Sequence, residues 1–173
     1  ILGFYDLTHL YNLKERPTLY ATQETLVGLR QIHKYPLDPF MPKIIQSFES
    51  FEIDHNKFSF ISVKHNHFPT WGLKIKGSRL ICYLPDIRSL PKSQEKTCKD
   101  VHLLILDGSS LEKVGQARTH ESIADGLILG KKLKAKQIYF THIGHKTGKH
   151  KDLEKFVREK GGENFHIAYD GLE

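Results

Sequence analysis

The sequence predicts an α/β protein in which helices pack on a mixed β-sheet. Its first half contains short apolar runs separated by turn residues, whereas its second half alternates buried apolar strands with helices. Its 173 residues are 39% hydrophobic, which provides enough apolar material for one core. We therefore expect a single domain over residues 1–173.

The first half is predicted to begin with a strand over Thr18–Ala21 and a helix over Gln23–Ile32, with Thr22 as the N-cap. The segment Lys34–Pro42 contains three prolines and predicts a loop. Turn residues then separate four further strands, which form two hairpins. These strands are expected at Phe48–Ile53 with Lys57–His65, and at Gly72–Ile75 with Arg79–Leu84.

The second half contains two uninterrupted apolar runs, Val101–Leu106 and Gln137–Phe140, which are typical of strands buried on both faces. A shorter final strand is expected at Phe165–Tyr169. Between these strands the sequence predicts helices over Pro91–Lys99, His120–Leu133 and Asp152–Lys160.

Charge and cysteine content restrict the classes of function. Lys and Arg number 26 against 20 acidic residues, a formal net charge of +6 that suits a phosphate-bearing ligand. No apolar run approaches the ~18–20 residues of a membrane span, so no membrane partner is expected. Cys82 and Cys98 match neither a disulfide framework nor a zinc-binding pair, which favours a reducing, cytoplasmic location.

Side chains able to bind a metal follow three of the predicted strands. They are His65, with His67 close behind it, then Asp86, and finally His142. A residue placed directly after a strand lies at the rim of the sheet, where a rigid element aims it into a cleft. Imidazole and carboxylate ligands suit Zn²⁺, Mn²⁺ or Fe²⁺, so the three positions together indicate a metal site.

Four motifs carry a resemblance to a known family. They are His65 with Pro69 and Gly72, Tyr83-Leu84-Pro85-Asp86, Phe140-Thr141-His142-Ile143-Gly144-His145, and Tyr169-Asp170-Gly171. In this order they resemble the metallo-β-lactamase fold and, within it, the phosphodiesterase branch. That branch includes the cyclic phosphodiesterase of phosphonate breakdown and, more distantly, ribonuclease Z. The resemblance implies an αβ/βα sandwich of which this chain forms the C-terminal part.

One family motif has no counterpart in the sequence. Members carry His-x-His-x-Asp-His after an early strand, and this motif supplies four metal ligands. The opening residues of the chain resemble the helix that follows it, so we expect a fragment that begins after the motif; the alternative is a protein that evolved without it. For the fragment we expect an exposed sheet face, low metal affinity and at most one bound ion.

The resemblance implies a role for each candidate residue. His65 and His142 would each complete a metal position, and Asp86 would bridge two divalent ions, Zn, Mn or Fe. His67 competes with His65 for the first position. His120 would contact the phosphate and protonate the leaving oxygen, and Asp86 and His120 are therefore the expected catalytic residues. In close relatives the residue equivalent to His145 joins a structural zinc site.

These roles imply a phosphodiesterase in which a metal-bridging hydroxide attacks small or cyclic phosphodiesters. One alternative is a nuclease acting on RNA or DNA, which is motivated by the lysines in 131–136 and 146–151. A second alternative is a non-catalytic binding module, should the natural protein lack the missing motif. By analogy with dimeric relatives we also expect a homodimer. Asp107 is interpreted as a cap for the next turn in preference to a residue that orients a ligating histidine.

Overall fold

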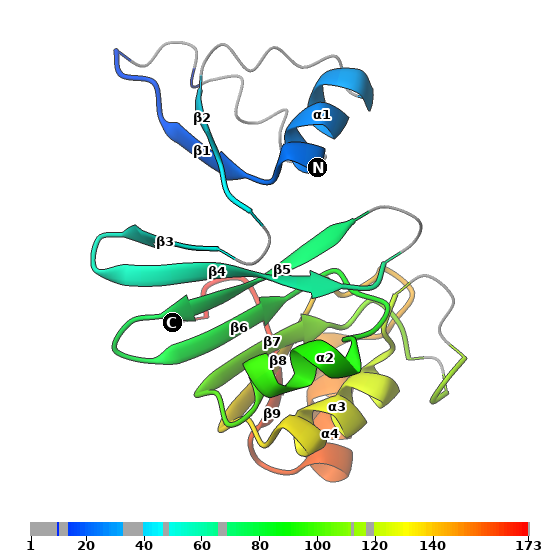
Figure 1. Cartoon of the computed structure of the whole chain (residues 1–173). Helices are drawn as coiled ribbons and strands as arrows, with labels where there is room; N and C mark the ends of the chain where they lie inside the picture. Colours follow the sequence, from blue (N-terminus) through cyan, green and yellow to red (C-terminus); the bar gives the residue numbers. More distant parts are fainter. Residues whose placement is uncertain are drawn as a thin grey trace. The chain divides into compact units, whose positions relative to one another are not determined.

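The structure, a computed structural model, describes residues 10, 14–32, 40–46, 49–65, 69–111, 113–116 and 120–172. The chain divides into two compact units, Ile1–Glu49 and Ser50–Glu173 (Figure 1). The residues implicated by the sequence motifs all belong to the second unit.

The first unit contains a parallel strand pair connected through a helix. Strand β1 (Thr18–Ala21) pairs with β2 (Met41–Ile44), and α1 (Gln23–Ile32) lies between them in sequence. The predicted N-cap is confirmed, because the Thr22 Oγ1 atom accepts a hydrogen bond of 3.3 Å from the Thr25 backbone N–H. Ala21, Leu26 and Leu29 form the small core of this unit.

The predicted loop at residues 34–42 is wrong at its end, because Met41 and Pro42 belong to β2. A proline lacks a backbone N–H, but it is tolerated in a strand that has a partner on one side only. In the described part of the chain β2 pairs with β1 alone, which explains how Pro42 is accommodated. Residues 33–39 lie outside the described residues.

The second unit is built on a seven-stranded sheet whose spatial order follows the sequence. The pairs from β3 to β6 are antiparallel, whereas those from β6 to β9 are parallel. Strands β4 and β6–β9 consequently run in the same direction, and their carboxyl ends lie along one edge of the sheet. The strands are β3 (Ser50–Ile53), β4 (Asn56–Val63), β5 (Thr70–Lys76), β6 (Leu80–Leu84), β7 (Leu103–Asp107), β8 (Gln137–Thr141) and β9 (Phe165–Ile167).

Helices of this unit cover one face of the sheet (Figure 1). They are α2 (Lys92–Glu95), the 3₁₀ turn η2 (Lys96–Cys98), α3 (Ile123–Leu133) and α4 (His150–Gly161). Fully buried side chains from the strands and helices form the core between them, among them Leu104, Ile123, Phe140 and Val157. The predicted α/β architecture, with helices on a mixed sheet, is confirmed.

The opposite face of the sheet carries aromatic and aliphatic side chains. The strand register places Phe60, Leu73, Tyr83, Ile105 and Tyr139 side by side on it. All five are partly exposed, and Tyr83 is 43% exposed. An apolar sheet surface of this kind is typical of a face that packs against further structure.

Helix α3 begins three residues later than its periodicity predicts. Its N-cap is Ser122, whose Oγ accepts a 3.1 Å hydrogen bond from the Asp125 backbone N–H and donates to the Asp125 carboxylate at 2.8 Å. His120 therefore lies in the connection before the helix, and its Thr119 neighbour lies outside the described residues. No helix among the described residues is long and apolar enough to span a membrane.

Glu121 is a buried carboxyl group between His120 and the α3 cap. It is 4% exposed, and its Oε2 atom has no hydrogen-bond partner among the described residues. Burial, followed by the nearby carboxylates of Asp125 and Asp107, raises the pKa of Glu121 to about 8. Near neutral pH the folded protein therefore holds this side chain in its uncharged form.

We expect the substitution Glu121→Gln to remove a pH-dependent loss of stability. The folded-state pKa is raised, so the contribution of Glu121 is fully present below pH ~4.5 and is lost as the pH rises towards about 8. The variant should gain at least about 1.4 kcal/mol over the parent at pH 8 and little at pH 4.5. Thermal melts at both pH values measure this difference; an equal shift at the two values would contradict it.

Lys134 ends α3 in a conformation that favours glycine. It is the C-cap, with φ 53° and ψ 38° in the left-handed region. We expect Lys134→Gly to stabilise the fold by roughly 1 kcal/mol, because glycine adopts this conformation without strain. Chemical denaturation compared with Lys136→Gly, a strand-flanking control without positive φ, tests this; equal effects of the two substitutions would contradict it.

Candidate metal and phosphate site

The site forms at the sheet edge where β4, β6, β7 and β8 end. His65 lies two residues after β4, Asp86 lies two residues after β6, Asp107 ends β7, and His142 directly follows β8. Since these strands run in the same direction, residues far apart in sequence are brought to one edge. Ligand atoms of Asp86, Asp107, His120 and His142 all lie within 4.8 Å of one another.

Asp86 lies among the imidazoles of this edge. Its Oδ1 atom is 3.5 Å from His65 Nε2 and 3.2 Å from His120 Nδ1. The same oxygen is shielded from solvent and has no hydrogen bond of acceptable geometry among the described residues. A shielded carboxylate oxygen without a hydrogen bond, facing ring nitrogens, fits a cationic ligand.

Local backbone contacts hold His65 against Asp86. The preceding residue, Lys64, forms an isolated bridge with Ser89, and its carbonyl accepts a hydrogen bond of 2.7 Å from the Arg88 N–H. The chain after β4 is thereby tied to the chain after Asp86. The His65 side chain is 15% exposed, and its ring centroid lies 4.8 Å from that of His120.

Asp107 is completely buried at the end of β7. Its Oδ1 atom accepts a 2.9 Å hydrogen bond from the Ser109 N–H, and its Oδ2 atom accepts a 3.3 Å bond from the Ile87 N–H. The same Oδ2 atom is 3.0 Å from His120 Nδ1. The predicted turn cap is therefore present, and the carboxylate also contacts a histidine; this histidine is His120, the expected proton donor, and not one of the expected metal ligands.

His120 is oriented by that carboxylate. An Nδ1–H that donates to Asp107 leaves Nε2 as the other functional nitrogen of the ring. The side chain is 30% exposed, so solvent or a bound molecule can reach it. Its ring lies between those of His65 and His142, at centroid distances of 4.8 and 5.4 Å.

His142 has the geometry of a histidine prepared for metal binding. Its φ of 58° turns the chain sharply at the end of β8, and its Nδ1 lies 3.1 Å from the Pro85 carbonyl. When Nδ1–H donates to that carbonyl, Nε2 is left with a free lone pair. Metal-binding histidines usually donate their second N–H to a carbonyl or carboxylate in this way.

The residues present fit a divalent cation. Asp86 and His142 belong to the metal-competent group found among the described residues, together with Asp107 and His120, whereas His65 adjoins this group through its Nε2 atom, 3.5 Å from Asp86 Oδ1. His65, Asp86 and His142 offer nitrogen and oxygen donors, the combination that Zn²⁺ and Mn²⁺ accept, and the shielded Asp86 oxygen has no hydrogen bond among the described residues. Asp107 is a poorer ligand because three hydrogen bonds already engage it. The donor set is thus consistent with a metal held by His65, Asp86 and His142, beside an oriented His120.

Two other histidines from the sequence analysis do not join this group. His67 lies outside the described residues. His145 is exposed in the loop after β8 and is not part of the metal-competent group found among the described residues. Its assignment to a structural zinc site stays a prediction.

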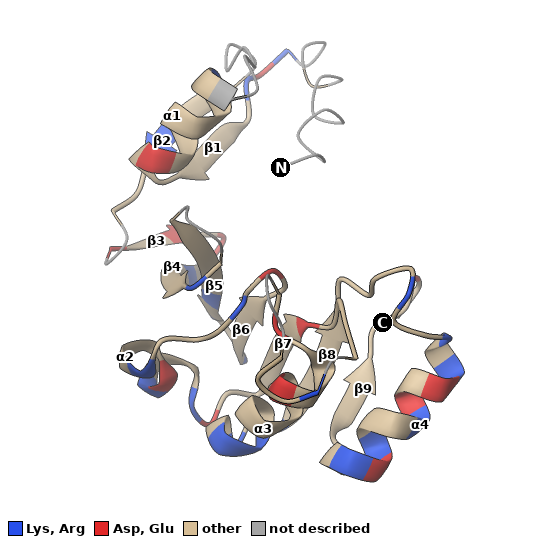
Figure 2. Cartoon of the chain, turned by 90° about the vertical axis from the view of Figure 1, so that its right-hand side faces the viewer, with Lys and Arg blue, Asp and Glu red and all other residues tan. Residues whose placement is uncertain are grey.

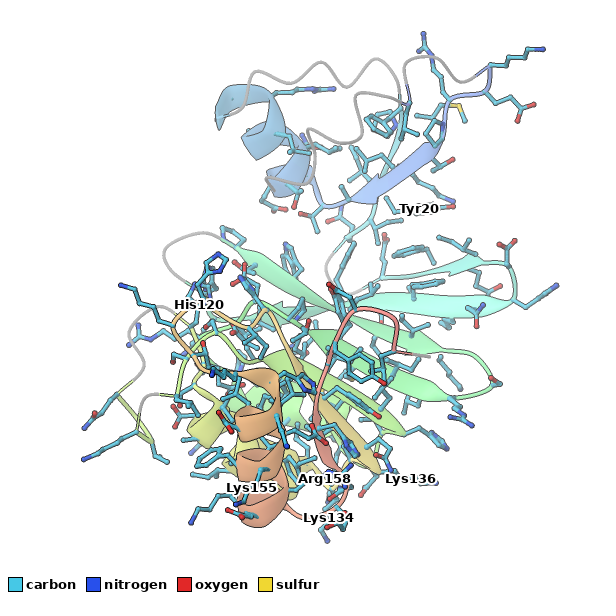
Figure 3. All side chains as sticks on the ribbon, turned by 180° about the vertical axis from the view of Figure 1, so that it is seen from behind. Tyr20, His120, Lys134, Lys136, Lys155 and Arg158 are labelled. Carbon is cyan, nitrogen blue, oxygen red and sulfur yellow. The ribbon has the colours of Figure 1, made fainter. Side chains whose placement is uncertain are left out.

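The two lysine-rich segments lie at different ends of the sheet. Lys134 and Lys136 precede β8, whereas the lysines of 146–151 follow it, as His142 does. Figure 3 shows His120 at one end of the unit and Lys134 and Lys136 at the other. The first segment therefore lies away from the site, and only the second adjoins it.

The chain resembles solved structures of hydrolases with this architecture. It is 26% identical to a structure described as a new diphosphatase from the PhnP family, with a TM-score of 0.83, covering 99% of this chain and 64% of that one. The chain thus spans less than two thirds of that protein's length. No curated protein sequence matches the chain.

Two further structures share the fold at lower identity. The metallo-β-lactamase fold protein YhfI from Bacillus subtilis is 18% identical with a TM-score of 0.72, over 88% of this chain and 62% of that one. Zn²⁺-bound PqqB from Methylobacterium extorquens is 19% identical with a TM-score of 0.68, over 94% of this chain and 66% of that one. The model of the beta-lactamase superfamily domain matches residues 3–143. With its fold and this match together, the chain belongs to the beta-lactamase superfamily.

Proposed function

We propose that the protein is a metal-dependent hydrolase that cleaves phosphodiester or diphosphate bonds. The observation that carries the proposal is the convergence of Asp86, Asp107, His120 and His142 within 4.8 Å at one sheet edge, with His65 Nε2 3.5 Å from Asp86 Oδ1. The likeness to a diphosphatase of the PhnP family supports the phosphorus chemistry. Small or cyclic phosphodiesters are the first substrate class to test.

His65, Asp86 and His142 would hold the metal. Bound divalent ions in such a site supply an activated hydroxide and offset the charge that develops on phosphorus oxygens. The protein's own contribution is to keep these donors in place through the Lys64–Ser89 bridge and the His142–Pro85 hydrogen bond. Donors that are positioned before binding need little rearrangement when the ligand arrives.

His120 would donate the proton that the leaving oxygen requires. Its Nδ1 is engaged by the buried Asp107 carboxylate, which orients the ring and leaves Nε2 as the nitrogen that can transfer the proton. Asp107 is then a positioning residue, because it acts through His120 and is itself fully buried. This assigns Asp86 to metal binding and His120 to proton transfer.

Removal of the Asp86 carboxylate should abolish activity. We expect Asp86→Ala in the full-length protein to lose hydrolysis of bis(p-nitrophenyl) phosphate by at least a factor of about 10³ and to bind less metal, since a ligand is lost. Metal analysis and steady-state kinetics measure both effects. Asp152→Ala, which removes an exposed carboxylate from the first turn of α4, serves as the matched control.

Metal removal should act in the same way. Treatment with a chelator should abolish activity in the parent, and added Mn²⁺ or Zn²⁺ should restore it there but not in Asp86→Ala. Unchanged turnover in Asp86→Ala or in the chelated parent would exclude the proposal.

Proton donation by His120 predicts a dependence on the leaving group. We expect Asp107→Asn and His120→Ala to slow cleavage of an alkyl phosphodiester by about 10²–10⁴-fold, with a smaller effect on a p-nitrophenyl ester, whose leaving group needs no proton. Both variants should retain bound metal. Equal losses on the two substrates would show that the pair does not supply the proton, and loss of metal from both variants would show that the pair helps to hold the metal.

A further inference from the structure

The segment after β8 carries cationic side chains that are free of ion pairs. Lys146, Lys149 and Lys151 are exposed, and no ion pair within the described residues involves any of them. Two other cations, on α3 and α4, are engaged in ion pairs: Lys132 pairs with Glu95 at 2.6 Å, and Arg158 pairs with Glu154 at 2.8 Å. The three lysines after β8 are therefore available to bind an anion.

This segment is held firmly beside the site. Thr147 Oγ1 donates a 2.6 Å hydrogen bond to the Ser109 carbonyl, and a Cβ atom on Gly144 would come within 2.5 Å of the same oxygen. The Ser109 N–H in turn binds Asp107, the partner of His120. Hydrogen bonds and close packing thus connect the lysine-bearing segment to the proposed proton donor.

An exposed aromatic side chain lies against the same segment. Tyr169, 56% exposed, follows β9, and its ring makes an edge contact with His150 at a centroid distance of 5.5 Å. His150 is fixed by its Nε2 atom, 3.2 Å from the Ile167 carbonyl. Figure 2 shows Lys and Arg on the connection that leads into α4, close to the chain end that follows β9.

We propose that Lys146, Lys149, Lys151 and Tyr169 form a nucleotide-binding subsite next to the hydrolytic centre. Lysine ammonium groups bind phosphate as point charges, and an exposed tyrosine ring is a surface on which any base can stack. The two acidic residues nearest in sequence, Asp152 and Asp170, form no ion pair with these lysines. This proposal rests on the proposed function, because it assigns a nucleotide component to the substrate of the proposed hydrolase.

Binding of ADP to the metal-loaded, full-length protein, followed by calorimetry, tests the subsite. Here and below, ADP and pyrophosphate stand for their non-hydrolysable analogues, in which a methylene group replaces the bridging oxygen, because the proposed activity would cleave the parent compounds. Lys149→Ala/Lys151→Ala should weaken ADP and inorganic pyrophosphate alike, each by about tenfold or more. Tyr169→Ala should weaken ADP by about fivefold or more and leave pyrophosphate unchanged, whereas Tyr169→Phe should bind both as the parent does.

The matched control is Lys134→Ala/Lys136→Ala, which removes the same charge from the opposite end of β8. ADP affinity should be unchanged in this variant. Equal weakening by the two double variants, or unchanged ADP binding in Tyr169→Ala, would overturn the subsite. Melting curves of all variants establish that each one is folded.

The same measurements separate this proposal from the proposed function. If Asp86→Ala hydrolyses diesters normally while ADP binding still depends on Tyr169, the subsite stands and the hydrolase assignment falls. If Asp86→Ala is inactive while Tyr169→Ala binds ADP as the parent does, the hydrolase assignment stands and the subsite falls.

Titration with single-stranded oligoadenylates distinguishes two sources of the nucleotide. Affinity that rises with the length of the oligonucleotide indicates a strand, and constant affinity indicates a free nucleotide.

Discussion

The site depends on the hydrogen bonds that the buried carboxylate of Asp107 accepts. A charge without solvent contact is stable only when hydrogen bonds satisfy it, and here the donors are the Ser109 N–H, the Ile87 N–H and His120 Nδ1. These donors belong to the connections that follow β7 and β6 and to the approach to α3. One carboxylate therefore ties together three loops that carry or border the candidate residues.

Strand direction accounts for the rest of the geometry. Because β4 and β6–β9 run the same way, each polar residue that ends a strand arrives at the same edge. The antiparallel β5 allows His65 to join, since two successive reversals restore the direction of β4. The helices contribute by covering one face, which keeps the strands rigid beneath the site (Figure 1).

The positive charge of the chain is divided between structural and available residues. Lysines and arginines in the last turns of α3 and α4 interact favourably with the helix dipole, and Lys131 also donates a hydrogen bond to the Lys160 carbonyl at 2.6 Å. The lysines after β8 form no ion pair within the described residues and adjoin the candidate site. The net charge of +6 alone does not distinguish these two groups, because it carries no information on pairing.

Much of the fold was predictable from local sequence. The uninterrupted apolar runs indicated β7 and β8, the Thr22 cap indicated α1, and polar residues directly after strands indicated His65, Asp86 and His142. Each of these signals lies within a few residues, so burial patterns and turn chemistry are enough to reveal it. The four motifs then indicated the family.

The tertiary structure alone decided three features: the hydrogen bond between Asp107 and His120, the start of α3 after His120, and the contact of Tyr169 with His150. The two contacts join residues that are a dozen or more positions apart in the sequence. The start of α3 depends on which of several neighbouring polar residues becomes the N-cap. These contacts form only when parallel strands bring their carboxyl ends together and bury Asp107 away from water.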